Sequence, residues 1–64
     1  MSILVTEVVL PLATPLAEAV ELALSDAMDT LYHNKPTAKV LSHGIHIAPF
    51  DTDNRCYVTS VVYQ

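Results

Sequence analysis

The chain has 64 residues and a mass of 7.0 kDa, with 52% hydrophobic residues, 16% charged residues and a net charge of −4. This length predicts one domain, residues 1–64, which buries only about 60% of the surface that the unfolded chain exposes. The basic residues Lys35, Lys39 and Arg55 are too few to neutralise a phosphate backbone, so we expect no DNA or RNA partner. We also expect no membrane partner, because no apolar run reaches the roughly 20 residues of a membrane span.

A domain this small usually needs disulfides, a structural metal or oligomerisation. Cys56 is the only cysteine, so no internal disulfide forms, and Cys56 with three histidines lacks the ligand spacing of a zinc site. We therefore expect a homo-oligomer without a cofactor, in which the partner is the chain itself. The lone thiol agrees with a reducing cytoplasm, either of a bacterium or of an infected host cell.

Residues 2–10 are rich in β-branched side chains and too short for a typical helix, which predicts a strand. Both faces of this strand are largely apolar. One face carries Ile3, Val5, Glu7 and Val9, and the other carries Leu4, Thr6, Val8 and Leu10. A helix on one face and a second subunit on the other would cover both, and the alternative is an apolar face left in water.

Thr14 and Pro15 predict the start of a helix, with the threonine as N-cap and the proline at the first helical position. The spacing of apolar residues predicts one buried stripe, made of Leu16, Val20, Ala23, Leu24, Ala27 and Leu31. The helix should end near residues 33–34, because Asn34 tolerates the left-handed conformation and Pro36 disfavours helical geometry at the residue before it.

Leu22 and Tyr32 lie among polar residues on the opposite side of this helix. We expect them either to form a helix contact between subunits or to be singly exposed apolar side chains, which are common.

Residues 37–64 predict a hairpin with its turn at residues 50–54. If Ile47 pairs with Cys56, the alternation of side chains along each strand assigns every residue of the hairpin to one of two faces. The expected core face carries Leu41, Ile45, Ile47, Cys56, Val58 and Val62. The opposite, non-core face is expected to carry Ser42, Gly44, His46, Arg55, Tyr57, Thr59 and Tyr63.

No motif predicts an enzyme. His43 and His46 are three residues apart on a strand and so point to opposite faces, which disfavours a metal site unless a bulge at Gly44 realigns them. The acidic turn at residues 51–54 lacks the glycine and the later glutamate of a calcium loop. Cys56 is expected in the core, where a thiol is a poor nucleophile.

We expect the ligand-binding residues to be His46, Arg55, Tyr57, Thr59 and Tyr63. Arginine can fork onto a phosphate, tyrosine can stack on a base, and threonine can donate to oxygens. Two such faces meeting across a symmetry axis would form a pocket for a small anionic ligand such as a nucleotide. The alternative is that these residues are the polar side of a sheet or its assembly contact.

The order strand, helix, hairpin, with a terminal strand at residues 57–63, resembles the short sporulation-associated and phage-encoded βαββ proteins, above all through residues 40–47 and 56–63. This resemblance implies a small oligomer and, as in some phage anti-defence proteins, sequestration of a host nucleotide signal. The order is also similar to that of dodecins, which store flavin, but the chain has no tryptophan on which flavin would stack.

The fold class predicted is therefore α+β: one βαββ domain with three mostly antiparallel strands, one helix on one face, and homo-oligomeric assembly. The predicted function is a non-enzymatic binding protein that holds a small anionic ligand, such as a nucleotide signal, at a subunit interface. The alternatives are a protein-interaction module that inhibits or regulates a host protein, dodecin-like storage of a small molecule, and an enzyme dependent on His46 or Cys56.

Overall fold

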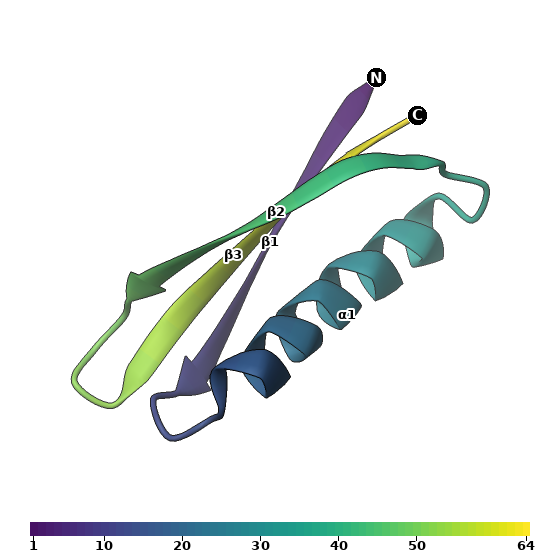
Figure 1. Cartoon of the computed structure of the whole chain (residues 1–64). Coiled ribbons are helices and arrows are strands. Elements are labelled where there is room, and N and C mark those ends of the chain that lie inside the picture. Colours follow the sequence, from purple (N-terminus) through teal and green to yellow (C-terminus); the bar gives the residue numbers. More distant parts are fainter.

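The computed structural model describes residues 1–64 and contains three strands and one helix. The elements follow in the order β1 (Ser2–Pro11), α1 (Leu16–Asn34), β2 (Val40–Pro49) and β3 (Asn54–Tyr63). The strand order in the sheet is β1-β3-β2, with β3 antiparallel to both neighbours. The helix covers one face of the sheet, and the two termini lie at the same end (Figure 1). The predicted α+β domain is confirmed, and no helix is both long and apolar enough to cross a bilayer.

Strand β1 forms as its β-branched run predicts, and it pairs along its full length with β3, from Ser2 opposite Tyr63 to Pro11 opposite Asn54. The side chains of Leu4 and Leu10 turn toward the helix and pack against the two core clusters. The face with Ile3, Val5 and Val9 is exposed. One apolar face of β1 is therefore covered by α1 and the other is left uncovered.

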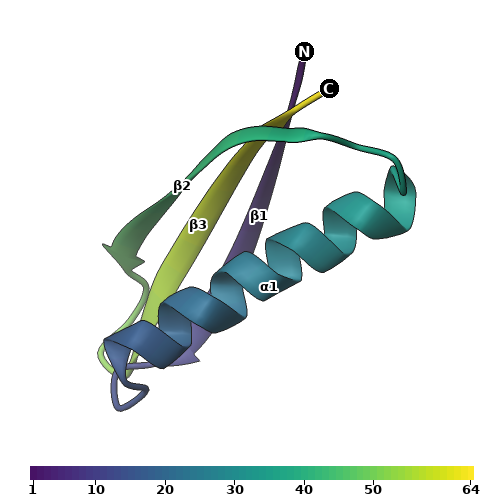
Figure 2. The same cartoon turned by 45° about the vertical axis from the view of Figure 1, so that its right-hand side comes forward.

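The buried side of α1 is a row of residues four apart, namely Ala19, Ala23, Ala27 and Leu31. Such a row is inclined to the helix axis, so the helix crosses the sheet obliquely (Figure 2). This corrects the predicted stripe, because Ala19 is buried whereas Leu16, in the first turn, stays exposed.

The three alanines carry single methyl groups, so α1 approaches β3 closely enough to enclose large side chains from the central strand. Tyr57 is fully buried against Ala19 and Ala23. Val61 packs in the same way against Ala27 and Leu31. The core thus consists of three alanines and Leu31 on the helix, packed against Tyr57 and Val61 of β3.

Both helix ends differ in detail from the prediction. The N-cap residue is Pro15 rather than Thr14, no side chain caps the helix, and the carbonyl of Pro15 accepts the first helical hydrogen bond from the N–H of Ala19 at 2.9 Å. At the other end the helix stops at Asn34 as expected, but no residue has a positive φ. Instead, Lys35 in an extended conformation donates its N–H to the carbonyl of Leu31 at 2.7 Å.

The predicted hairpin is present, but its register is shifted by one residue. Ile47 pairs with Tyr57, and Cys56 pairs with Ala48. The cause lies in the turn, where the carboxylate of Asp51 accepts a hydrogen bond from the Asp53 N–H at 2.8 Å and others from the Asn54 side chain at 2.9 and 3.1 Å. These bonds hold a loop one residue longer than the predicted pairing requires, and lower the pKa of Asp51 below its ordinary value.

The shift exchanges the two faces of β3 relative to β2, because side chains alternate along a strand. Residues Tyr57, Thr59 and Val61 lie under the helix, and Cys56, Val58 and Val62 lie on the uncovered face. The expected core face was therefore wrong for β3. On β2, Ile45 packs against the core, as predicted. Leu41 and Ile47, which were also expected on the core face, are 46% and 40% exposed.

Two cross-strand partners under the helix, Thr6 and Thr59, both have hydroxyl groups that are buried without a hydrogen-bond partner. A buried unpartnered hydroxyl costs free energy relative to an apolar group of similar shape. We therefore predict that Thr59→Val raises the free energy of unfolding by about 1 kcal/mol in a urea titration. Thr37→Val, at an exposed position, should leave it unchanged. A loss of stability in Thr59→Val would contradict this account of the core.

Candidate functional site

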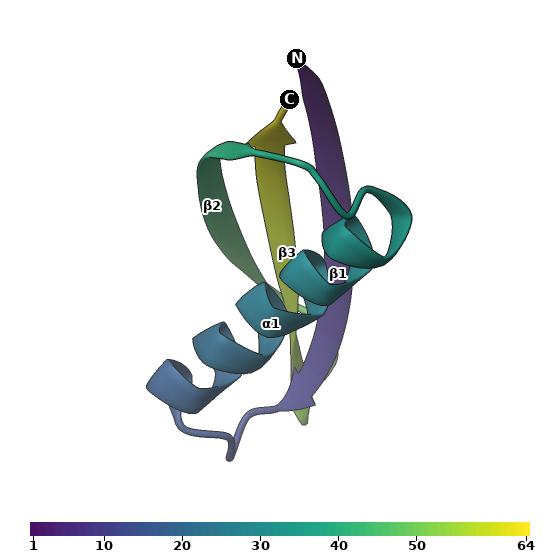
Figure 3. The same cartoon turned by 90° about the vertical axis from the view of Figure 1, so that its right-hand side faces the viewer.

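The candidate site is the face of the sheet turned away from α1, which we call the open face. Residues of the three strands lie side by side on it in four rows, because cross-strand partners point to the same side. The rows are Val9, Cys56 and Ala48; Glu7, Val58 and His46; Val5, Ser60 and Gly44; and Ile3, Val62 and Ser42. Figure 3 views the sheet from the side of α1, and Figure 1 shows that no element of the fold lies on the opposite side of the sheet.

The open face is unusually apolar for an uncovered surface. On β1, Ile3, Val5 and Val9 are 66%, 58% and 44% exposed. The central strand adds Val58 and Val62, both half-buried between their neighbours. An antiparallel sheet with one solvated face normally alternates apolar inward and polar outward residues, and contiguous apolar patches on monomers mark contact sites.

Only two ionisable side chains project from this face besides the thiol, Glu7 on β1 and His46 on β2. They belong to one row, on either side of Val58. The other six acidic residues are elsewhere: Glu18, Glu21, Asp26 and Asp29 on α1, and Asp51 and Asp53 in the turn. The negative charge of the chain is therefore concentrated away from the open face.

Cys56 is buried between its neighbours on this face, and its thiol lies 3.8 Å from a carboxylate oxygen of Glu7, to which it donates a weak hydrogen bond. Burial, followed by the negative charge and the hydrogen bond of Glu7, raises the pKa of the Cys56 thiol above its ordinary value. The thiolate is the reactive form, so Cys56 has the opposite character to a catalytic nucleophile.

Two consequences can be measured. At neutral pH, iodoacetamide should alkylate Cys56 several times more slowly than a free thiol, and Glu7→Gln should increase the rate, because it removes the charge that opposes thiolate formation.

The raised pKa of Cys56 also contributes stability to the fold. This stability is fully present below the unfolded-state pKa near 9.0 and is lost as the pH rises through the folded-state pKa. Cys56→Ala should lack that alkaline loss, and a fast reaction of the wild-type thiol would contradict the assignment.

The structure does not bring the five predicted ligand residues together. His46 is exposed on the open face, whereas Arg55, Tyr57, Thr59 and Tyr63 project to the helix side. Tyr57 and Thr59 are fully buried under α1, where their side chains cannot reach a ligand without displacing the helix. Tyr63 is half-buried against the core.

The other predicted positions can be placed as well. Leu22 and Tyr32 are exposed on the solvent side of α1, where a contact between subunits stays a prediction. His43 and His46 do point to opposite faces, as their spacing predicts, and Gly44 sits in regular pairing with Ser60 without a bulge. The irregularity in β2 occurs instead between Val40 and Ser42. No three His, Cys, Asp or Glu side chains cluster as metal ligands.

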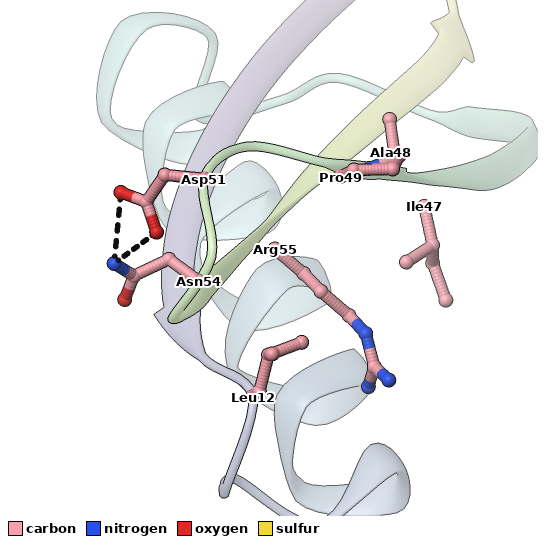
Figure 4. Close-up of a pocket in the computed structure, with 7 residues that line it drawn as sticks. All are labelled: Leu12, Ile47, Ala48, Pro49, Asp51, Asn54 and Arg55. Atoms are coloured by element: carbon pink, nitrogen blue, oxygen red, sulfur yellow. Dashed lines mark hydrogen bonds between the residues drawn. The ribbon is translucent and has the colours of Figure 1, made fainter.

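Arg55 lines a hollow of about 300 Å³ on the helix side of the hairpin end, together with Leu12, Ile47, Ala48, Pro49, Asp51 and Asn54. The Arg55 side chain extends between Leu12 and Ile47, whereas the side chains of Asp51 and Asn54 point to the other side of the loop (Figure 4). The carboxylate of Asp51 is already bonded to its own turn. The guanidinium of Arg55 takes part in no side-chain hydrogen bond within the chain, so it is available to bind an anion.

No protein family model, curated protein or solved structure matches the chain. The resemblances to sporulation-associated and phage proteins and to dodecins stay predictions.

The sequence predicts only part of the open face. It predicts the second apolar face of β1 as a candidate subunit contact, but it places Val58, Val62 and Cys56 in the core. The signal that distinguishes the two faces of β3 is the spacing of Ala19, Ala23 and Ala27, since a strip of methyl groups accommodates the largest side chain, Tyr57, rather than Val58.

Proposed function

We propose that this chain is a non-enzymatic protein-interaction module whose contact surface is the open face of the sheet. The observation that supports this most is the exposure of Ile3, Val5 and Val9 beside Val58 and Val62 on one continuous surface. Covering such a surface with another protein removes apolar area from water. This burial contributes a favourable free energy of roughly 25 cal/mol per Å², against which the costs of association act. The protonated, poorly reactive thiol of Cys56 argues against a nucleophilic enzyme on the same face.

The test compares two lysine substitutions of exposed apolar residues. Val5→Lys places a charge in the middle of the β1 edge of the open face, and Leu22→Lys places the same charge on the solvent side of α1. We expect Val5→Lys to abolish association, measured as particle mass by light scattering and as retention of any copurifying protein, and Leu22→Lys to preserve it. Wild-type association in Val5→Lys, with its fold intact by circular dichroism, would refute the proposal.

A second candidate function, binding of a small anionic ligand, is favoured by the free guanidinium of Arg55. The hollow beside it combines that cation with the apolar side chains of Leu12 and Ile47, and its volume is at the small end of ligand sites. A phosphate or carboxylate attached to an apolar or aromatic group fits this combination. In this form the nucleotide-signal proposal depends on Arg55 and no longer on Tyr57 or Thr59.

Titration calorimetry against a panel of mononucleotides and cyclic dinucleotides tests this second candidate. We expect heat with the wild type, loss of the heat in Arg55→Gln, and retention in Lys39→Gln, which removes an exposed cation elsewhere. Absence of heat with the wild type, or equal heats in the two variants, would contradict it.

A further inference from the structure

The distribution of side-chain sizes on the open face is asymmetric across the sheet. The β1 edge carries the bulky Ile3, Val5 and Val9, whereas the β2 edge carries Ser42, Gly44 and Ala48 in the same rows. Two sheets pack well when large residues of one face small residues of the other. A surface with bulky side chains along one edge and small side chains along the other is complementary to a second copy of itself after a half-turn about an axis that runs between the edges.

The two ionisable side chains at the edges follow the same arrangement. Glu7 on the β1 edge and His46 on the β2 edge occupy one row, with Val58 between them. A half-turn about an axis parallel to β3 places Glu7 of each copy opposite His46 of the other, so the pair occurs twice. A two-fold axis can also lie between the two sheets but run perpendicular to the strands. That axis would stack β1 on β1, with bulky residues facing bulky residues and Glu7 near Glu7. The size and charge patterns therefore select the same axis independently.

We propose that a second copy of the chain covers the open face, related by a two-fold axis parallel to β3, so that β1 of each copy lies on β2 of the other. This inference rests on the proposed function and names its partner. A two-fold axis along the strands allows no sliding along them, so each row faces the same row of the second copy. Val5 then packs over Gly44, which has no side chain, and Val58 meets Val58.

The size of the surface agrees with a specific interface. Strands of ten residues at about 3.3 Å per residue, and three strands about 4.8 Å apart, give a footprint of roughly 33 Å by 14 Å. Covering it on two copies removes on the order of 1,000 Å² of accessible surface, which is about the minimum for a specific complex. The exposed acidic residues of α1 lie on the outer sides of this dimer, which limits the repulsion between two chains of charge −4.

Gly44→Val tests the contact between Val5 and Gly44 by filling the space over Gly44. A Cβ at Gly44 meets only the hydroxyl oxygen of Ser60 at 3.7 Å, an ordinary contact, and Gly44 does not have a positive φ. Valine also suits a strand. We expect sedimentation velocity to show a wild-type particle of twice 7.0 kDa, and Gly44→Val to raise the dimer dissociation constant about ten-fold or more with an unchanged circular dichroism spectrum. Leu22→Glu is the control and should remain dimeric.

The axis is tested by exchanging the charges. Glu7→Lys should weaken the dimer because it removes the carboxylate that faces His46 of the other copy. His46→Glu should weaken it because it sets a glutamate against Glu7 of the other copy. The double variant Glu7→Lys/His46→Glu should recover it, because lysine of one copy then faces glutamate of the other. Under the perpendicular axis the double variant would keep lysine near lysine and would stay weak, which would overturn the proposed arrangement.

The failure of this inference and the failure of the proposed function give different results. A wild-type monomer at high micromolar concentration, or a dimer broken by Leu22→Glu and not by Gly44→Val, overturns the second copy as the occupant. If such a monomer nevertheless forms a complex with a different protein that Val5→Lys abolishes, the open face is still the contact surface. A dimer insensitive to both Val5→Lys and Gly44→Val overturns both.

Discussion

Tyr57→Ala is expected to unfold the domain at room temperature. Tyr57 is the largest fully buried side chain, it lies on the central strand, and it packs against Ala19 and Ala23 of the helix. Removal of a buried aromatic ring costs about 3–5 kcal/mol. A core of this size supplies only about 3–5 kcal/mol of net stability, so the substitution removes most of it.

Far-UV circular dichroism and urea titration measure this effect, and Tyr57→Phe is the matched control. Phenylalanine keeps the ring and removes a hydroxyl that is buried without a hydrogen-bond partner. We expect Tyr57→Phe to be as stable as the wild type or more stable. A folded Tyr57→Ala with a wild-type urea midpoint would show that Tyr57 is not under the helix.

Ala23→Leu should destabilise the domain by about 3 kcal/mol, near the upper end of the usual range for overpacking. Ala23 is fully buried in the middle of the helix row and contacts Tyr57. Three additional carbon atoms find no space there, so α1 must move away from the sheet or the ring of Tyr57 must leave its position.

Ala17→Leu provides the control for Ala23→Leu, because it makes the same chemical change on an exposed side of the same helix. Leucine and alanine have similar helix propensities, so Ala17→Leu should change the free energy of unfolding by less than about 0.5 kcal/mol. Equal effects of the two substitutions in urea titrations would contradict the assignment of Ala19, Ala23 and Ala27 to the contact row.

The elements of the fold could be predicted because each has a strong local pattern. The β-branched run before Pro11 gave β1, the apolar spacing after Pro15 gave α1, and the polar turn at residues 50–54 separated the two strands of the hairpin. Details that depend on one or two hydrogen bonds could not be predicted. Thr14 carries the right side chain for an N-cap, yet the chain places Pro15 there.

The register of the hairpin could not be predicted, because hydrophobicity does not distinguish the two faces of β3. One face has Tyr57 and Val61 and the other has Val58 and Val62, with Thr59 and Ser60 as the polar residue on each. The hydrogen bonds of Asp51 in the turn and the room that Ala19 and Ala23 leave for Tyr57 decide between them. Both are tertiary effects that span more than one element.

The candidate site changed for the same reason. A shift of one residue moved Tyr57 and Thr59 from an expected ligand surface into the core, and moved Val58 and Val62 from the core onto the open face. His46 and Arg55 kept their exposure to solvent, wholly or in part, but on opposite sides of the sheet. The surface most suited to function is consequently apolar rather than polar.

Isotope-filtered nuclear Overhauser spectroscopy on a mixture of labelled and unlabelled chains tests most directly whether the open face is the contact surface. We expect intermolecular contacts between the Val5 methyl groups of one copy and the Gly44 α-protons of the other. Within one chain these groups lie two strands apart, about 9.6 Å by strand spacing, which is too far for such a contact. Intermolecular contacts from Leu22 or Tyr32 in place of Val5, or none from any residue of the open face, would contradict it.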